Sequence, residues 1–144
     1  MIYTEQLNVL LSSYQLHYQN LRSLHWNIKG YHFFELHVKY EELYTRTQEI
    51  VDELAERILS IGSTPLSRFS DYQSKSLISE TDIITDAKAG VTYILDAQQK
   101  ILSLEQQLLE DSEALEDEGT NALMSDLIRE KEKNNWMMRS WLGN

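Results

Sequence analysis

The sequence predicts an all-α fold: a four-helix bundle with one long crossover, which carries a short helix between the second and third long helices. Apolar residues recur at steps of three and four through four long segments, which is the period of amphipathic helices. The 144 residues contain only one Pro and five Gly, too few for a β protein with many turns. The length is that of one domain, so we expect residues 1–144 to form a single domain.

The first two long helices are expected over residues 4–29 and 33–61. Gly30 and Gly62 stand just beyond their ends, where glycine commonly terminates a helix. The connection between the two helices is therefore a tight one. The apolar stripes consist of Leu7, Leu10, Leu11, Tyr14, Tyr18, Leu21 and Leu24 in the first helix, and of Phe33, Leu36, Tyr40, Leu43, Thr47, Ile50, Leu54, Ile58 and Ile61 in the second.

A long crossover is expected over residues 62–81, where the apolar periodicity is lost. Pro65 interrupts this segment and serine is frequent in it. The run Ser70-Asp71-Tyr72-Gln73 has the spacing of a capping box. We therefore expect one short helix to begin there.

The third and fourth long helices are expected over residues 82–115 and 120–141, with only residues 116–119 between them. Two tight links on either side of one long link give two antiparallel helix pairs, which is the ferritin-like version of a four-helix bundle. The expected stripes are Ile83, Ala87, Val91, Ile94, Ile101 and Leu108 in the third helix, and Leu123, Leu127, Met137 and Trp141 in the fourth.

Composition limits the chemistry that the chain can perform. Thirteen basic and 23 acidic residues give a net charge of −10, which repels bare nucleic acid and attracts cations. The chain has no Cys, so disulfides, iron–sulfur clusters and thiolate zinc sites are excluded and His, Asp and Glu remain as strong metal ligands. The N-terminal residues do not resemble a leader peptide, and no apolar run approaches a membrane span. We expect a soluble cytoplasmic protein.

Four potential metal ligands share one arc of the second helix. Counting about 100° per residue from His37, Glu41 lies near ~40°, Asp52 near ~60° and Glu56 near ~100°. The apolar stripe of the same helix centres near roughly −100° by the same count. These side chains therefore point away from the core of their own bundle, towards a surface suited to another subunit.

A single chain cannot bring all four ligands to one site. Glu41 and Asp52 are 11 positions apart, about 16 Å along a helix, which is too far for one metal ion or a close pair of ions. Two antiparallel copies of the helix about a two-fold axis would place His37 and Glu41 of one chain opposite Asp52 and Glu56 of the other. His25, near the end of the first helix, could join the His37 end.

Less specific interpretations stay open at this point. Carboxylates and imidazoles at helical spacing are often solvated surface residues, and the bundle could be purely structural, with no metal. The Glu-x-x-His pattern of iron sites inside a single bundle is absent. We interpret His17 as a packing or surface residue and His32 as a turn residue. Trp26 is interpreted either as a core residue or as an electron donor beside a redox metal.

Two segments of the sequence form a long and specific pattern of histidines, aromatic residues and carboxylates. They are His25-Trp26-Asn27-Ile28-Lys29-Gly30-Tyr31-His32-Phe33-Phe34-Glu35-Leu36-His37 and Asp52-Glu53-Leu54-Ala55-Glu56-Arg57-Ile58. These segments resemble the signature of the Dps family, the miniferritins that protect DNA during starvation. The resemblance extends through Gly62-Ser63-Thr64-Pro65 and, more weakly, to Trp136-Met137-Met138-Arg139.

The resemblance implies a ferroxidase that stores iron. In that family, twelve four-helix subunits form a hollow shell from two-fold dimers, iron is oxidised mainly by hydrogen peroxide at sites shared between two subunits, and ferric mineral is stored inside. The resemblance implies that the iron ligands are His25, His37, Asp52 and Glu56, with Glu41 at a position where the family usually has Asp. It also places Trp26 next to the sites.

The competing hypothesis is an architectural protein that binds and protects DNA in the nucleoid. Many members of the family bind DNA through Lys-rich extensions, whereas here only residues 1–3 precede the first helix and the chain ends at Gly143-Asn144. The densest basic stretch, residues 129–133, alternates with glutamates and is interpreted as a salt-bridged helix face. We expect no direct DNA binding.

A cluster of acidic residues lies at the end of the third helix, in the region where the family has acidic three-fold pores. We expect either that some of these residues attract Fe²⁺ or that they form a solvated acidic loop. The cluster consists of Glu110, Asp111, Glu113, Glu116, Asp117 and Glu118.

Overall fold

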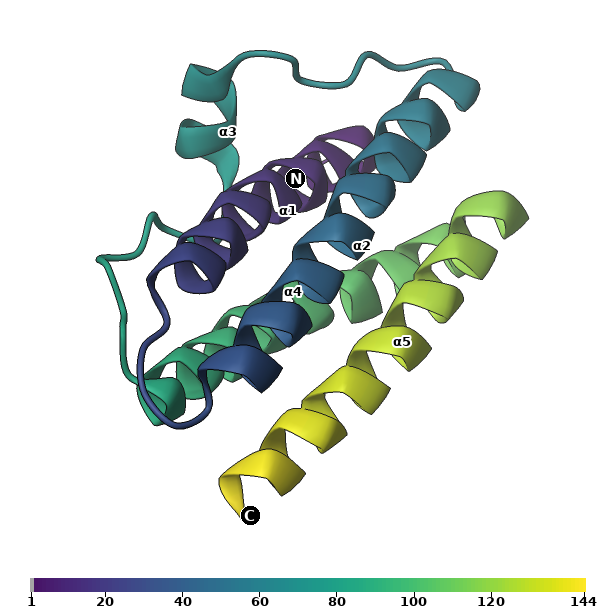
Figure 1. Ribbon diagram of the computed structural model, residues 1–144. Coiled ribbons are helices and arrows are strands. Elements are labelled where there is room, and N and C mark those ends of the chain that lie inside the picture. The colour runs from purple at the N-terminus through teal and green to yellow at the C-terminus, as the bar shows by residue number, and fades with distance from the viewer. Residues whose placement is uncertain (1) are drawn as a thin grey trace.

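Four long helices lie side by side and a short helix lies outside them (Figure 1). The computed structural model describes residues 2–144; Met1, the first residue of the N-terminal segment considered above, lies outside them. The described residues contain no strand, so the predicted all-α class is confirmed. The helices are α1 (Tyr3–Asn27), α2 (Phe33–Ser60), α3 (Phe69–Lys75), α4 (Ala87–Ala114) and α5 (Glu118–Leu142).

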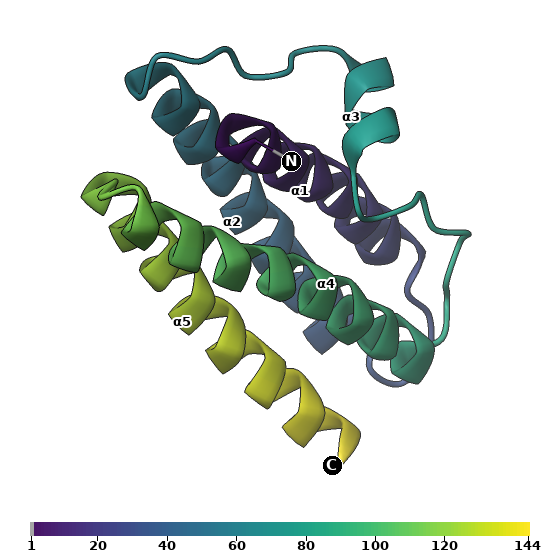
Figure 2. The ribbon, with the colours of Figure 1, turned by 180° about the vertical axis from the view of Figure 1, so that it is seen from behind.

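The helices form two pairs joined by a crossover. The helix α1 packs against α2, α4 packs against α5, and α1 also contacts α3 and α4. The connection from α2 to α4 runs the length of the bundle and carries α3 past the outer side of α1, as both views show (Figures 1 and 2). This is the predicted ferritin-like arrangement. Among residues 2–144, no helix combines the length and the apolar character needed to cross a membrane.

The crossover begins its helix differently from the prediction. The helix α3 starts at Phe69 after Arg68, whose backbone is extended and whose side chain does not cap the helix. Ser70 lies inside the first turn, so the predicted capping box is wrong. The chain before α3 is held instead by α1, because the Asn8 Oδ1 atom accepts a hydrogen bond of 2.9 Å from the Leu66 N–H.

The helix α4 begins five residues later than predicted. The Asp86 side chain caps it by accepting a hydrogen bond of 2.8 Å from the Ala89 N–H, which satisfies one of the free amides of the first turn. Ile83 therefore lies in the preceding loop with 70% of its surface exposed. Its predicted place in the apolar stripe is wrong.

The buried stripe of α5 also departs from the prediction, because polar residues occupy part of it. Lys131 and Asn135 are buried, while Met137 is exposed. The stripe runs at steps of three and four when these polar residues are included. Its buried members are Thr120, Met124, Leu127, Lys131, Asn135 and Met138.

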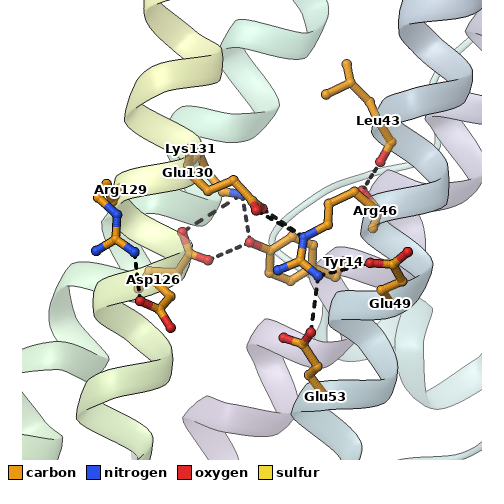
Figure 3. Close-up of polar contacts among 11 residues, drawn as sticks. Tyr14, Leu43, Arg46, Glu49, Glu53, Asp126, Arg129, Glu130 and Lys131 are labelled. Atoms are coloured by element: carbon orange, nitrogen blue, oxygen red, sulfur yellow. Dashed lines mark hydrogen bonds and ion pairs between the residues drawn. The ribbon is translucent and has the colours of Figure 1, made fainter.

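Lys131 belongs to a polar cluster in the centre of the bundle. Its Nζ atom donates a hydrogen bond of 2.7 Å to the Tyr14 hydroxyl, which in turn donates one of 2.5 Å to the Glu105 carboxylate (Figure 3). Burial lowers the pKa of Lys131 and raises the pKa of Glu105, although each group opposes the shift of the other. The buried polar groups thus hold α1, α4 and α5 together.

The predicted salt-bridged face of α5 is only partly correct. Arg129 pairs with Asp126 at 2.8 Å, and Glu130 receives the Arg46 guanidinium of α2 at 3.0 Å (Figure 3). Lys131 follows Glu130 directly but points inwards and is buried, so it is not part of that face.

His17 is a buried packing residue, one of the two alternatives expected for it. It lines the same small cavity as Tyr14 and Lys131, and its Nδ1 atom has no hydrogen-bond partner among the described residues. Burial and the nearby Lys131 ammonium lower the pKa of His17 to about 3, against a smaller opposing effect of Gln98. The imidazole is therefore neutral in the folded protein.

Acidification from pH 7 to pH 5 is expected to destabilise each subunit by about 2 kcal/mol through His17. The pKa of His17 is lower in the folded chain than in the unfolded chain, so the unfolded chain takes up the proton first. Stability therefore falls below about pH 6.5 and this loss ends near the folded pKa of about 3. Chemical denaturation of the wild type and of His17→Gln at both pH values measures the effect. Equal losses in the two proteins would contradict it.

Candidate metal centre

Two histidines meet where α1 ends and α2 begins. The tight connection of residues 28–32 brings His25 and His37 together, and their rings stack with centroids 3.7 Å apart and planes 14° from parallel. His25 is buried and His37 is half-buried. The structure therefore brings His25 next to His37 at the start of α2.

Each of these histidines is held by the backbone of the other. The His25 Nδ1 atom lies 2.6 Å from the His37 carbonyl oxygen, and the His37 Nδ1 atom lies 2.8 Å from the His25 carbonyl oxygen. A carbonyl oxygen only accepts, so both Nδ1 atoms carry the proton and donate. Both Nε2 atoms therefore keep a free lone pair when the rings are neutral, which is the tautomer that a metal ion binds.

Glu41 brings a carboxylate next to one of the free nitrogens. Its Oε1 atom lies 3.6 Å from the His25 Nε2 atom, and its side chain is 58% exposed. A carboxylate together with two imidazole nitrogens is a donor set that suits Fe²⁺ and similar divalent ions. His25, His37 and Glu41 form what we call the imidazole half-site.

Two aromatic side chains support the imidazole half-site, and the sequence did not single them out for this. Phe33 stacks on His37, with centroids 4.9 Å apart and planes 20° from parallel. Tyr44 meets the His25 ring edge-on at 5.3 Å. Their spacings of four and seven residues from His37 place both on its side of α2, and this was the one available signal.

Asp52 and Glu56 form a second group, the carboxylate half-site, one turn apart and exposed on α2. A hydrogen bond with Asp52 and the charge of Asp52 raise the pKa of Glu56, because two carboxylates so close together resist full ionisation. A bound cation would relieve this repulsion. The arrangement is that of an open anionic pair facing away from its own bundle.

The structure does not unite the two half-sites within one chain. Along a single helix, Glu41 and Asp52 are about 16 Å apart. Among residues 2–144, no three His, Asp or Glu side chains are arranged so that together they would hold a metal ion. Each chain thus presents two incomplete donor sets on one face of α2.

Exposed apolar side chains accompany the half-sites. Phe34, Val38 and Leu59 are 83%, 55% and 58% exposed. Counted from His37 at about 100° per residue, they lie at about 60°, 100° and 40°, within the arc of the potential ligands. An apolar surface of this kind around polar groups is typical of a protein–protein contact.

Trp26 is not a core residue, so that interpretation is wrong. The side chain is 57% exposed, and the Arg22 guanidinium lies 4.9 Å from its ring centroid. Trp26 follows His25 directly but lies on the outer side of α1. His32, in contrast, is in the turn before α2 as expected, and its Nδ1 atom lies 2.6 Å from the Glu35 carboxylate.

The acidic cluster at the end of α4 divides into two groups. Asp117 caps α5, accepts a hydrogen bond from Tyr3 and pairs with Arg57 at 2.6 Å. Burial acts to raise the pKa of Asp117, but hydrogen bonds, those from Thr120 foremost, lower it to about 2. Asp117 is thus a structural residue. A separate hollow of about 340 Å³ is lined by Ser112, Glu113, Glu116, Glu118 and Asn121.

Known proteins resemble this chain over nearly its whole length. The ferritin-like domain family matches residues 4–144. DNA protection during starvation protein 2 from Bacillus anthracis is 35% identical, and the match covers 96% of this chain and 94% of that protein.

Two solved structures resemble this chain in both sequence and fold. The Dps protein from Vibrio cholerae O1, a member of a broad superfamily of ferritin-like diiron-carboxylate proteins, is 44% identical with a TM-score of 0.95, and the match covers 97% of this chain and 88% of that one. Dps from Staphylococcus aureus is 30% identical with a TM-score of 0.94, and the match covers 97% of this chain and 94% of that one. The domain match and these relatives show that the chain belongs to the Dps family of ferritin-like proteins.

Proposed function

We propose that this protein oxidises Fe²⁺ with hydrogen peroxide and stores the ferric product in a hollow shell of identical subunits. The observation that carries this proposal is the pair of reciprocal hydrogen bonds between His25 and His37, which leaves both Nε2 atoms free, with that of His25 lying 3.6 Å from the Glu41 carboxylate. Imidazoles held in this tautomer present the Nε2 lone pair that a metal ion binds. Iron is the substrate of this site.

The complete site is built by two subunits. An antiparallel pairing of two α2 helices about a two-fold axis places the imidazole half-site of one chain opposite the carboxylate half-site of the other, and gives two equal sites per dimer. The exposed Phe34, Val38 and Leu59 side chains supply apolar surface for that contact. Repetition of the dimer gives the shell of twelve subunits that the family resemblance implies, acting in the cytoplasm.

The ligands divide the chemical work between them. Imidazole nitrogens and carboxylate oxygens bind ferrous iron and leave positions open for peroxide. Two Fe²⁺ ions give up one electron each to H₂O₂, whose O–O bond breaks to give two hydroxide ions. The carboxylates of Asp52 and Glu56 also stabilise the more highly charged Fe³⁺ product. Glu41, longer by one methylene than the Asp usual in the family, sets the position of the second iron.

Protection of DNA follows from this chemistry, because it removes the two reagents that together produce hydroxyl radicals. The Bacillus anthracis relative bears the name of DNA protection. Direct binding of the protein to DNA is the alternative way to protect it, and the net charge of −10 per chain opposes such binding. From the acidic cluster, Glu113, Glu116 and Glu118, which line the hollow beside α5, are the residues that we propose draw Fe²⁺ towards the shell.

Loss of a ligand from either half-site is expected to slow peroxide-driven oxidation of Fe²⁺ by more than about tenfold, since even changes to the partners of ligands cost that much. The variants are His25→Ala and Asp52→Asn, with Glu42→Gln on the same helix as the control. Ferric absorbance after mixing with Fe²⁺ and either peroxide or air measures the rates. Rates in the two ligand variants equal to that of Glu42→Gln would overturn the site.

Shared sites are expected to complement each other in mixed shells. Co-expression of His37→Ala and Glu56→Ala chains with two different affinity tags yields mixed shells, in which random pairing restores about a quarter of the sites. Each parent shell has none. Iron bound and oxidised per shell is the measurement. Mixed shells that are assembled but no more active than their parents would show that the sites are internal to one chain.

The purified shell is expected not to retard duplex DNA in a gel at physiological salt without divalent cations. The reason is the net charge of −10 per chain, because an acidic protein does not displace the cations that are condensed on the phosphate backbone of DNA. Titration of labelled duplex with the protein at two salt concentrations tests this. A salt-sensitive shift would instead support the architectural function.

A further inference from the structure

Tyr44 is the redox-active side chain in direct ring contact with the imidazole half-site. Its edge-on contact with His25 has a centroid distance of 5.3 Å. A second tyrosine continues the contact, because Tyr18 meets Tyr44 edge-on at 5.9 Å. Tyr44 is half-buried and packs against the core on one side. A phenol thus lies in van der Waals contact with a ligand ring.

Trp26, for which an electron-donor role was one of the two interpretations of the sequence, lies in a less favourable place. The Arg22 guanidinium lies 4.9 Å from the Trp26 ring centroid and 5.3 Å from the Tyr18 ring centroid. A fixed positive charge stabilises the neutral electron-rich ring and opposes the positive charge left when an electron is removed. In the described part of the chain, Trp26 has no ring contact with either imidazole, and no guanidinium lies over Tyr44.

We propose that Tyr44, rather than Trp26, is the electron donor that protects the site when a single Fe²⁺ ion meets hydrogen peroxide. This inference rests on the proposed function, because it requires iron to bind beside His25. The case arises whenever one of the two iron positions is empty. Only one electron is then available from the metal, and the second must come from the protein.

The atoms and electrons of this reaction balance. One Fe²⁺ and H₂O₂ give Fe³⁺, a hydroxide ion and a hydroxyl radical as the O–O bond breaks. The hydroxyl radical takes the hydrogen atom of the Tyr44 phenol, which yields water and a neutral Tyr44 radical. Tyr18 can then pass an electron to Tyr44 across the edge-on ring contact; Tyr44 takes up a proton and Tyr18 releases one to water, so that the neutral radical moves one ring further from the metal. The Arg22 charge beyond Tyr18 disfavours a further step to Trp26.

The test mixes intact shells carrying less than one Fe²⁺ per site with excess hydrogen peroxide and freezes them within the reaction time. Electron paramagnetic resonance detects the radical, and protein grown with ring-deuterated tyrosine shows whether the signal belongs to tyrosine. A spin trap in solution reports hydroxyl radicals that escape. The variants are Tyr44→Phe, which keeps the ring and loses the phenol, Trp26→Phe, and the exposed Tyr31→Phe as the matched control.

We expect Tyr44→Phe to lose most of the radical signal and to release several-fold more trapped hydroxyl radical, while Trp26→Phe and Tyr31→Phe behave as the wild type does. Arg22→Gln should let the radical reach Trp26 and change the signal to that of an indole. A wild-type signal insensitive to tyrosine deuteration, or lost in Trp26→Phe and kept in Tyr44→Phe, would overturn the proposal.

The same samples separate this inference from the proposed function. Ferric absorbance at full iron loading measures the two-electron reaction on its own, and the rate in Tyr44→Phe relative to the Tyr31→Phe control shows how far the substitution disturbs the half-site itself. Iron oxidation without a tyrosine radical overturns the role of Tyr44 alone. No peroxide-dependent iron oxidation in the wild type overturns the proposed function itself.

Discussion

Two hydrogen bonds between the backbone and the rings of His25 and His37 join the fold to the chemistry of this protein. They tie the last turn of α1 to the first turns of α2, and so close the tight connection that sets the first helix pair. The same bonds fix which nitrogen of each ring carries the proton. A structural link between two helices and a metal-binding tautomer are thus one and the same interaction, and neither can be altered without the other.

The helix α2 carries packing residues on its inner face and potential metal ligands on its outer face. Its inner stripe packs against the rest of the bundle, while its outer arc carries both half-sites among exposed apolar side chains. The half-sites are about 16 Å apart on this helix, so the site that we propose forms only where two helices of this kind meet. Under that proposal, assembly and activity depend on the same surface, and a subunit without its partner holds no complete site for iron and peroxide.

Regular spacing made α2 predictable, whereas polar residues in the core limited the prediction of α5. The stripe from Leu36 to Ile58 follows steps of three and four without interruption and is buried as expected. In α5, Lys131 and Asn135 occupy buried positions that an apolar pattern cannot register. The ligand arc could be predicted because it depends only on helix geometry. The tautomer of His25 and His37 could not be predicted, since it depends on carbonyl groups that tertiary packing brings to the rings.

The cluster of Tyr14, Glu105 and Lys131 makes the fold of the subunit independent of a bound metal ion. Glu105 and Lys131 together carry no net charge wherever their proton resides, so the bundle centre needs no bound ion to balance a buried carboxylate. Small metal-dependent domains, in contrast, unfold when their ion is removed. Here the centre of the bundle is balanced without an ion, so the fold of the subunit does not depend on the iron that we propose it oxidises and stores. A chelator that removes this iron would leave the subunit folded and able to take up iron again.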